Sequence, residues 1–200
     1  MSRGQQNQSN GSQRSEAALA TSDEVALIQS AQADLAAFGP LYARYVDRIY
    51  SYLLTRTGSA RPEDAADLTQ QVFLRALDAL PRYRPGPAPF AAWLFRIAAN
   101  AAVDAGRRRR PDIAWEALPP LPAAPESEPE AHALRRESLG RLRRLVAGLD
   151  AEKRELLALR FAGQLSSTEI AAVVGKRPEA VKKQLTRILR TLKEQYDEAE

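Results

Sequence analysis

The chain has no cysteine, one histidine and one methionine among its 200 residues. Without thiols it can form neither a disulfide nor a thiolate metal site. No apolar run approaches the roughly 20 residues that span a bilayer, and the first twenty residues lack the apolar segment of a secretory signal. We therefore expect a cytoplasmic protein with no membrane insertion, no metal and no other cofactor.

The sequence also has few groups suited to catalysis. A nuclease or hydrolase of nucleic acid needs carboxylates that share a metal, or a nucleophile beside a base. Asp64 and Asp67 are one helical turn apart, but no third ligand is evident, and His132 stands in a proline-rich segment away from both. We expect no enzymatic activity.

The distribution of charged residues and prolines divides the chain into segments. The net charge is +4, but residues 24–110 carry 12 basic and 8 acidic side chains, residues 111–133 carry 5 acidic and no basic ones, and residues 134–200 carry 15 and 10. Six of the 13 prolines fall in 111–133. We expect a disordered tail over 1–23, a helical domain over 24–110, an acidic linker over 111–133 and a second helical domain over 134–196. Two basic segments around an acidic one indicate two modules that face nucleic acid.

Apolar residues recur with helical spacing almost everywhere, and no segment alternates as a strand does. The pattern predicts helices over 24–58, from Pro62 onward and over 90–109. The segment from Pro81 to Phe90 holds four prolines and one glycine and predicts a loop. Asp150 is a candidate helix cap in the second domain. The fold class is therefore all-α, with two small helical domains joined by a flexible linker.

Residues 166–193 have the pattern of a helix-turn-helix. Ser166 and Glu169 form a capping box, Gly175 ends the first helix, and Pro178 begins the second. One stripe of the second helix is apolar, comprising Val181, Leu185, Ile188 and Leu192. The polar and basic residues that project away from this stripe include Lys182, Lys183, Thr186, Arg187 and Arg190. Such a helix reads the major groove, although a solvated basic face on a helical hairpin is the alternative.

A second polar stripe lies on the helix predicted over 90–109. Arg96, Asn100, Asp104 and Arg107 share one face, and the helix runs into the basic residues that include Arg108. This mixture suits phosphates and base edges, or alternatively a surface helix whose terminal cations complement its dipole. Aromatic residues cluster beside it, namely Tyr83, Phe90, Trp93 and Phe95. Aromatic faces next to arginines bind unstacked bases, but we expect at least two of the four to be mostly buried.

Together these segments resemble the group IV, or extracytoplasmic-function (ECF), sigma factors of bacterial RNA polymerase. Residues 64–77 resemble sigma region 2.2, residues 90–110 resemble regions 2.3 and 2.4, and residues 149–189 resemble region 4. The resemblance covers nearly the whole chain after the tail. It implies an initiation factor that binds core RNA polymerase and promoter DNA, acts at the nucleoid and is held by an anti-sigma factor.

The resemblance also implies roles for individual residues. Core polymerase would be bound by Asp67, Gln70 and Gln71, although many relatives have an acidic residue at position 71. The single-stranded minus-10 element would be bound by Arg96, Asn100, Asp104, Arg107, Arg108, Tyr83 and Trp93. The duplex minus-35 element would be bound by Lys182, Lys183, Thr186, Arg187 and Arg190. Around Val181 the chain departs from the common family pattern, so its minus-35 preference is expected to differ.

Two other functions remain open from the residues alone. A stand-alone helix-turn-helix regulator would explain residues 166–193, but it leaves the Asn100 stripe and the acidic linker without a role. An enzyme acting on nucleic acid is the second alternative. Binding of promoter duplex without polymerase distinguishes the regulator from the initiation factor.

Overall fold

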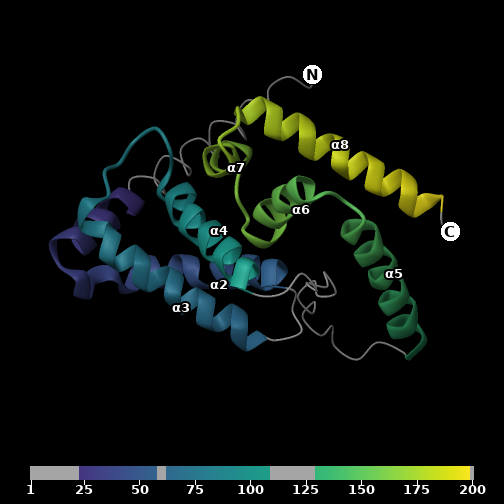
Figure 1. The fold of residues 1–200 in the computed structure, drawn as a ribbon, viewed down its shortest axis with the longest axis horizontal. Coiled ribbons are helices and arrows are strands. Elements are labelled where there is room, and N and C mark those ends of the chain that lie inside the picture. Colours follow the sequence, from purple (N-terminus) through teal and green to yellow (C-terminus); the bar gives the residue numbers. More distant parts are fainter. Residues whose placement is uncertain (1–22, 58–61, 109–128, 199–200) are drawn as a thin grey trace, which may run out of the picture.

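A computed structural model describes residues 23–57, 62–108 and 129–198 of the chain (Figure 1). The tail predicted over 1–23 and the linker predicted over 111–133 lie outside the described residues, apart from residue 23 and residues 129–133. Within the described ranges all regular structure is helical, as the sequence predicts.

The first helix spans 23–33, and Asp34 ends it. The Asp34 carboxylate accepts a hydrogen bond of 2.9 Å from the Ala36 amide and so caps the short 3-10 helix η1 (Leu35–Phe38). Helix α2 (Gly39–Thr57) follows directly. The continuous helical pattern predicted over 24–58 is therefore wrong, because an aspartate cap divides it into two helices and a 3-10 turn.

Helices α3 (Pro62–Ala79) and α4 (Phe90–Arg108) confirm the predicted start at Pro62 and the predicted helix from Phe90. Between them, the 3-10 helix η2 (Leu80–Arg82) extends α3 by a short turn, and residues 83–89 form the loop. Helices α2, α3 and α4 pack against one another as a bundle. Their shared core contains Leu41, Ile49, Leu53, Val72, Phe73 and Leu94.

The C-terminal half comprises four helices and a π-helical turn. They are α5 (Pro129–Ala147), α6 (Ala151–Leu157), the π-helix η3 (Ala158–Ala162), α7 (Ser167–Val174) and α8 (Pro178–Asp197). Asp150 caps α6 as predicted, accepting a 2.8 Å hydrogen bond from the Lys153 amide. Helix α5 begins within the segment expected to be linker. Both α5 and α6 pack against α8, and α7 packs beside it.

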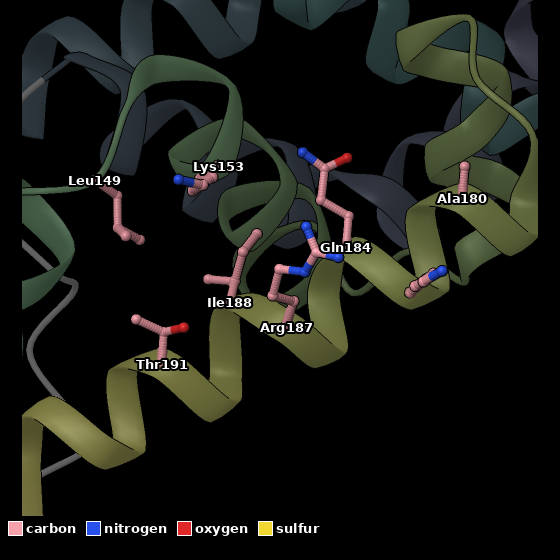
Figure 2. Close-up of a pocket in the computed structure, with 8 residues that line it drawn as sticks. Leu149, Lys153, Ala180, Gln184, Arg187, Ile188 and Thr191 are labelled. Atoms are coloured by element: carbon pink, nitrogen blue, oxygen red, sulfur yellow. The ribbon is translucent and has the colours of Figure 1, made fainter.

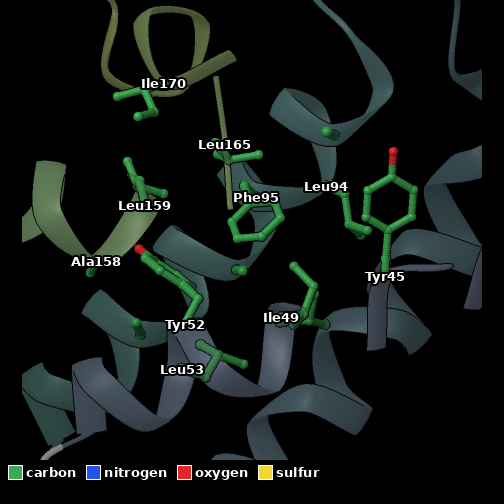
Figure 3. Close-up of a cluster of buried hydrophobic side chains, with 14 of the residues drawn as sticks. Tyr45, Ile49, Tyr52, Leu53, Leu94, Phe95, Ala158, Leu159, Leu165 and Ile170 are labelled. Atoms are coloured by element: carbon green, nitrogen blue, oxygen red, sulfur yellow. The ribbon is translucent and has the colours of Figure 1, made fainter. Parts of the chain in front are cut away.

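The two halves are packed together. Helix α2 contacts η3, and α4 contacts α7 (Figure 1). Figure 3 shows Tyr52 and Phe95 from the N-terminal half in one cluster with Leu159, Leu165 and Ile170 from the C-terminal half. All five side chains are fully buried, and burial of such a side chain is worth about 1.5–3 kcal/mol. The sequence does not predict this contact between the halves.

Polar contacts line the same interface. The Tyr52 hydroxyl donates a 2.6 Å hydrogen bond to Glu155, and Arg56 forms a 3.0 Å ion pair with that carboxylate. Arg48 donates to the Gly163 carbonyl at 3.0 Å while its guanidinium lies over the Phe95 ring. The hydrogen bond from Tyr52 to Glu155 and the one from Arg48 to Gly163 each join α2 to a residue more than 100 positions further along the chain.

Candidate nucleic-acid interface

Helices α7 and α8 form the helix-turn-helix that the sequence predicts. Ser166 accepts a hydrogen bond from the Glu169 amide, and the Glu169 carboxylate accepts one from the Ser166 amide, which completes the capping box. Gly175 follows α7 with φ of 70°, in the left-handed region that favours glycine. The four apolar residues of the predicted stripe on α8 are buried. The turn and the buried stripe together orient α8 on the rest of the domain.

The outward face of α8 is open and basic. All five residues predicted to bind minus-35 DNA, Lys182, Lys183, Thr186, Arg187 and Arg190, are exposed and line one shallow groove with Glu179. Thr186 donates to the Lys182 carbonyl at 3.0 Å, and Arg190 lies 3.7 Å from Glu194. Lys183 and Arg187 also line a neighbouring concavity on the side that faces α6 (Figure 2). Cations therefore extend over two adjacent faces of α8.

A polar network joins α6, the turn and α8 next to this surface. Glu152 accepts hydrogen bonds from Lys176 and, at 2.6 Å, from the Gln184 amide. The Lys176 hydrogen bond and then the Gln184 hydrogen bond lower the pKa of the exposed Glu152 carboxyl. The Gln184 side chain is thus hydrogen-bonded within the domain.

The polar stripe of α4 has the arrangement that its spacing predicts. Arg96, Asn100 and Arg107 are exposed, and Asp104 is half-buried 3.7 Å from Arg75 of α3. Arg96 donates a 2.6 Å hydrogen bond to the carbonyl of Ala172 in α7. The Arg108 side chain lies outside the described residues. The structure thus brings the predicted α4 residues to one face, and it also brings α7 against that face.

The aromatic residues beside α4 form a packed cluster. The Tyr83 ring lies 5.4 Å from Phe90 and 4.9 Å from Trp93, measured between centroids. Tyr83, Phe90 and Phe95 are buried and Trp93 is partly exposed, which confirms the expectation that at least two are mostly buried. An open cleft of about 640 Å³ lies between the loop, the first helix, α2 and α7. Its lining includes Tyr83, Phe90 and the loop residues 85–89.

Ionisable groups meet along one side of this cleft. The Tyr45 hydroxyl donates to Glu24, and Arg44 lies 3.9 Å from the same carboxylate. Burial, followed by the hydrogen bond to Glu24, raises the pKa of Tyr45 well above its ordinary value. Burial likewise raises the pKa of Tyr83. Both hydroxyls therefore stay neutral near pH 7, and Arg44 and Arg48 supply the positive charge in the cleft lining.

The three residues predicted to contact core polymerase lie on α3. Asp67, Gln70 and Gln71 are all exposed, while Leu68 and Val72 of the same helix are buried. The structure places this surface on a separate helix from the α4 stripe. Among the described residues no group of three or more histidine, cysteine, aspartate or glutamate side chains is placed to hold a metal. No described helix has the length and apolarity to cross a membrane.

Sequence reasoning missed the residues that connect these surfaces. Gln32 of the first helix donates to two carbonyls of the loop region, and Arg48 joins α2 to Gly163. Their partners are 48 or more positions away. No local spacing marks such contacts, because helical periodicity identifies which face of a helix is buried but not what covers it.

Comparison with known proteins identifies the two halves. The model for Sigma-70 region 2 matches residues 41–111, and the model for Sigma-70 region 4 matches residues 139–192. The ECF RNA polymerase sigma factor SigD of Mycobacterium tuberculosis is 37% identical over 151 residues, covering 74% of this chain and 71% of SigD. The chain belongs to the ECF sigma factors.

Further relatives of this ECF sigma factor support the assignment. CarQ of Myxococcus xanthus is 35% identical over 171 residues, covering 82% of this chain and 91% of CarQ. The solved structure of CnrH in complex with the cytosolic domain of CnrY superposes with a TM-score of 0.61 at 27% identity, over 87% of this chain and 97% of CnrH. The protein is thus an alternative sigma factor, a transcription initiation factor of RNA polymerase.

Proposed function

We propose that this ECF sigma factor reads its promoters in two parts, with α8 on duplex minus-35 DNA and α4 with the adjoining loop on single-stranded minus-10 DNA. Two observations carry the proposal: the exposed stripe of Arg96, Asn100 and Arg107 on α4, and the cleft with aromatic lining formed by the loop and the start of that helix. A helix-turn-helix regulator has no use for that second surface. In this proposal the chain keeps the organisation expected from its sequence, which is a tail over 1–23, a region 2 domain over 24–110, a linker over 111–133 and a region 4 domain over 134–196.

In the minus-10 complex, Asn100 and Asp104 contact base edges, and Arg96, Arg107 and Arg108 contact phosphates. The loop and Trp93 receive an unpaired base, and the Tyr83 ring packs against Trp93. Taking a base out of the stack costs a few kcal/mol, and stacking on an aromatic ring returns about 1–3 kcal/mol. Asp104 must release Arg75, an exposed partner whose loss costs little.

In the minus-35 complex, Lys182, Lys183, Thr186 and Arg187 enter the major groove, and Arg190 lies near phosphate. Arginine and lysine donate to guanine, and threonine contacts either base type or a thymine methyl. Glu179 lies in the same groove of the protein, where it disfavours a nearby phosphate and favours a cytosine amino group.

Partners follow from the same proposal. Asp67, Gln70 and Gln71 of α3 dock on core polymerase, which leaves the α4 stripe free for DNA. CnrH was solved in complex with the cytosolic domain of CnrY, and we include an anti-sigma factor among the partners of this chain. The factor works in the cytoplasm at the nucleoid, and it has no catalytic activity of its own.

The packing between the halves constrains this mechanism. Helix α7 contacts α4 and accepts the hydrogen bond of Arg96, and Ser166 and Glu169 line the same cleft as the loop. A phosphate bound by Arg96 therefore competes with its hydrogen bond to α7.

The experiment compares variants of the two surfaces in one assay of polymerase binding and promoter opening. Asn100→Ala should impair opening, whereas Lys183→Ala or Arg187→Ala should weaken minus-35 recognition by about 1–3 kcal/mol per lost base contact. All three should bind core polymerase normally. Lys193→Ala, on the same helix but outside the groove, is the matched control. Equal loss of polymerase binding in the three variants would contradict the proposed roles.

A further inference from the structure

The first helix carries a side chain that reaches the start of the minus-10 loop. The Gln32 amide nitrogen donates to the Leu80 carbonyl at 2.9 Å and to the Tyr83 carbonyl at 2.8 Å. Gln32 is half-buried, and Ile28 and Ala31 of the same helix are buried in the core. Both protons of one amide group are therefore used on backbone atoms at the two ends of η2.

The carbonyls at this position in the backbone accept hydrogen bonds from several donors. The last carbonyls of a helix have no partner within it, and here α3 passes through η2 into a loop that contains Pro85, Pro87 and Pro89. Proline has no amide proton to donate. The Tyr83 amide satisfies Leu80 on one side at 3.0 Å. Arg84 donates to the Tyr83 carbonyl at 3.1 Å. Gln32 adds one donor to each of the two carbonyls, and it is the donor that comes from a separate helix.

The two Gln32 hydrogen bonds hold the backbone on both sides of the turn that ends at Tyr83, whose ring belongs to the aromatic cluster. Tyr83 leaves η2 in an extended conformation, so the position of its carbonyl determines both where its ring lies and where the loop begins. That ring contacts Phe90 and Trp93, and all of residues 85–90 line the cleft. A shift of the Tyr83 backbone would therefore move the aromatic wall and the loop together.

We propose that Gln32 is a positioning residue for the minus-10 loop: it touches no DNA, but it fixes the cleft that selects the unpaired base. This inference rests on the proposed role of the loop in capturing that base. It adds that base selectivity depends on a hydrogen bond donor in the first helix, outside the residues matched by the sigma region 2 model.

Two substitutions distinguish the effect of the hydrogen bonds that Gln32 donates from the effect of the packing of its side chain. Gln32→Met keeps the length and apolar volume of the side chain but removes both donors. Gln32→Glu keeps the shape and places carboxylate oxygens against two carbonyl oxygens, which repel them. Gln29→Met is the matched control, because Gln29 is an exposed residue of the same type on the same helix.

The test uses the full chain bound to core polymerase on promoter forks whose minus-10 non-template strand is already single-stranded. Each position of that strand is varied through the four bases, and complex lifetime and opening rate are measured. Gln32→Met should reduce the preference for the best base at one position by about tenfold, the size expected for two neutral hydrogen bonds. Gln32→Glu should reduce it further, and Gln29→Met should match the unmodified chain. Polymerase affinity and minus-35 dependence should be unchanged in all three.

Each other result has a distinct meaning. An unchanged base preference in Gln32→Met would overturn the inference while leaving the proposed function in place. Parallel loss of thermal stability, polymerase affinity and opening would assign Gln32 a purely structural role and also overturn it. If the unmodified chain discriminates among no bases at any minus-10 position, the proposed function itself fails.

Discussion

Arg96 of α4 donates a hydrogen bond to the Ala172 carbonyl of α7, so a side chain predicted to contact DNA also joins the two domains. The adjacent Phe95 ring packs into the same interface, where Gly163 lies against it. Region 2 and region 4 thus meet at the face that the proposed function assigns to the minus-10 strand. The stability of this interface can be measured without DNA or polymerase.

Gly163→Ala should destabilise the folded chain. An added Cβ would lie 2.7 Å from Cε1 of Phe95 and 2.8 Å from the Leu159 carbonyl oxygen, which is a backbone atom of the π-helical turn. Overpacking of this kind costs about 1–3 kcal/mol, measurable by urea unfolding. Gly39→Ala is the control, because no atom lies within 4 Å of its Cβ position, and it should leave stability unchanged or raise it by up to about 1 kcal/mol. Equal effects of the two substitutions would contradict the packing described for Gly163.

Glu155 should stabilise the interface through both its partners. Tyr52→Phe removes one hydrogen bond and should cost about 1 kcal/mol. Glu155→Ala leaves the Tyr52 hydroxyl and Arg56 without their shared acceptor and should cost about 2 kcal/mol in the same urea measurement. Glu194→Gln removes a fully surface ion pair with Arg190 and should change stability by less than about 0.5 kcal/mol. A double-mutant cycle that gives no coupling between positions 52 and 155 would contradict the contact.

The buried tyrosines predict loss of stability at alkaline pH. Burial raises the pKa of both Tyr45 and Tyr52 in the folded chain, with Glu24 and Glu155 respectively adding to the effect. Between the unfolded tyrosine pKa, about 10, and the higher folded value, the unfolded chain has lost protons that the folded chain keeps. Stability should therefore be full below pH 10 and fall as pH rises above it.

Urea unfolding at a series of pH values from 8 to about 11 checks this prediction. Tyr45→Phe and Tyr52→Phe should each lower stability near pH 8 but reduce the fall above pH 10. Tyr42→Phe, at an exposed ring, should retain the full fall because both buried hydroxyls remain. An identical alkaline slope in all four proteins would refute the assignment.

The turn of the helix-turn-helix should be sensitive to glycine replacement. Gly175→Ala forces a side chain into the left-handed region and should cost about 1–2 kcal/mol of folding stability.

The cap at the start of α7 should also contribute to stability. Ser166→Ala removes the capping acceptor of α7 and should cost about 1 kcal/mol. Thermal unfolding followed by circular dichroism measures both. Ser167→Ala, one residue beyond the cap, should have a smaller effect than Ser166→Ala.

The C-terminal module was the most predictable part of the fold. The capping box, Gly175, Pro178 and the buried stripe of α8 are each encoded within a few residues, and each lies where the sequence predicts. The same applies to the loop before Phe90, because clustered prolines exclude a helix. The break at Asp34 was missed because the flanking residues keep a helical apolar pattern on both sides of the cap.

The contacts between distant segments were not predictable from one sequence. Arg48, Gln32 and Glu155 look like ordinary polar residues on helix faces, and their roles arise only when the two halves pack together. The exposed stripe on α4 was predicted from spacing alone. That α7 would lie against it was not, because the apolar face of a short helix does not specify its partner.

The most direct test of the account is promoter opening by the purified chain with core polymerase, followed on a promoter with a fluorescent base analogue in the minus-10 non-template strand. We predict start-site-specific opening that requires polymerase and is abolished or strongly slowed by Asn100→Ala. Tight binding of the duplex promoter by the chain alone, with opening unaffected by Asn100→Ala, would contradict it.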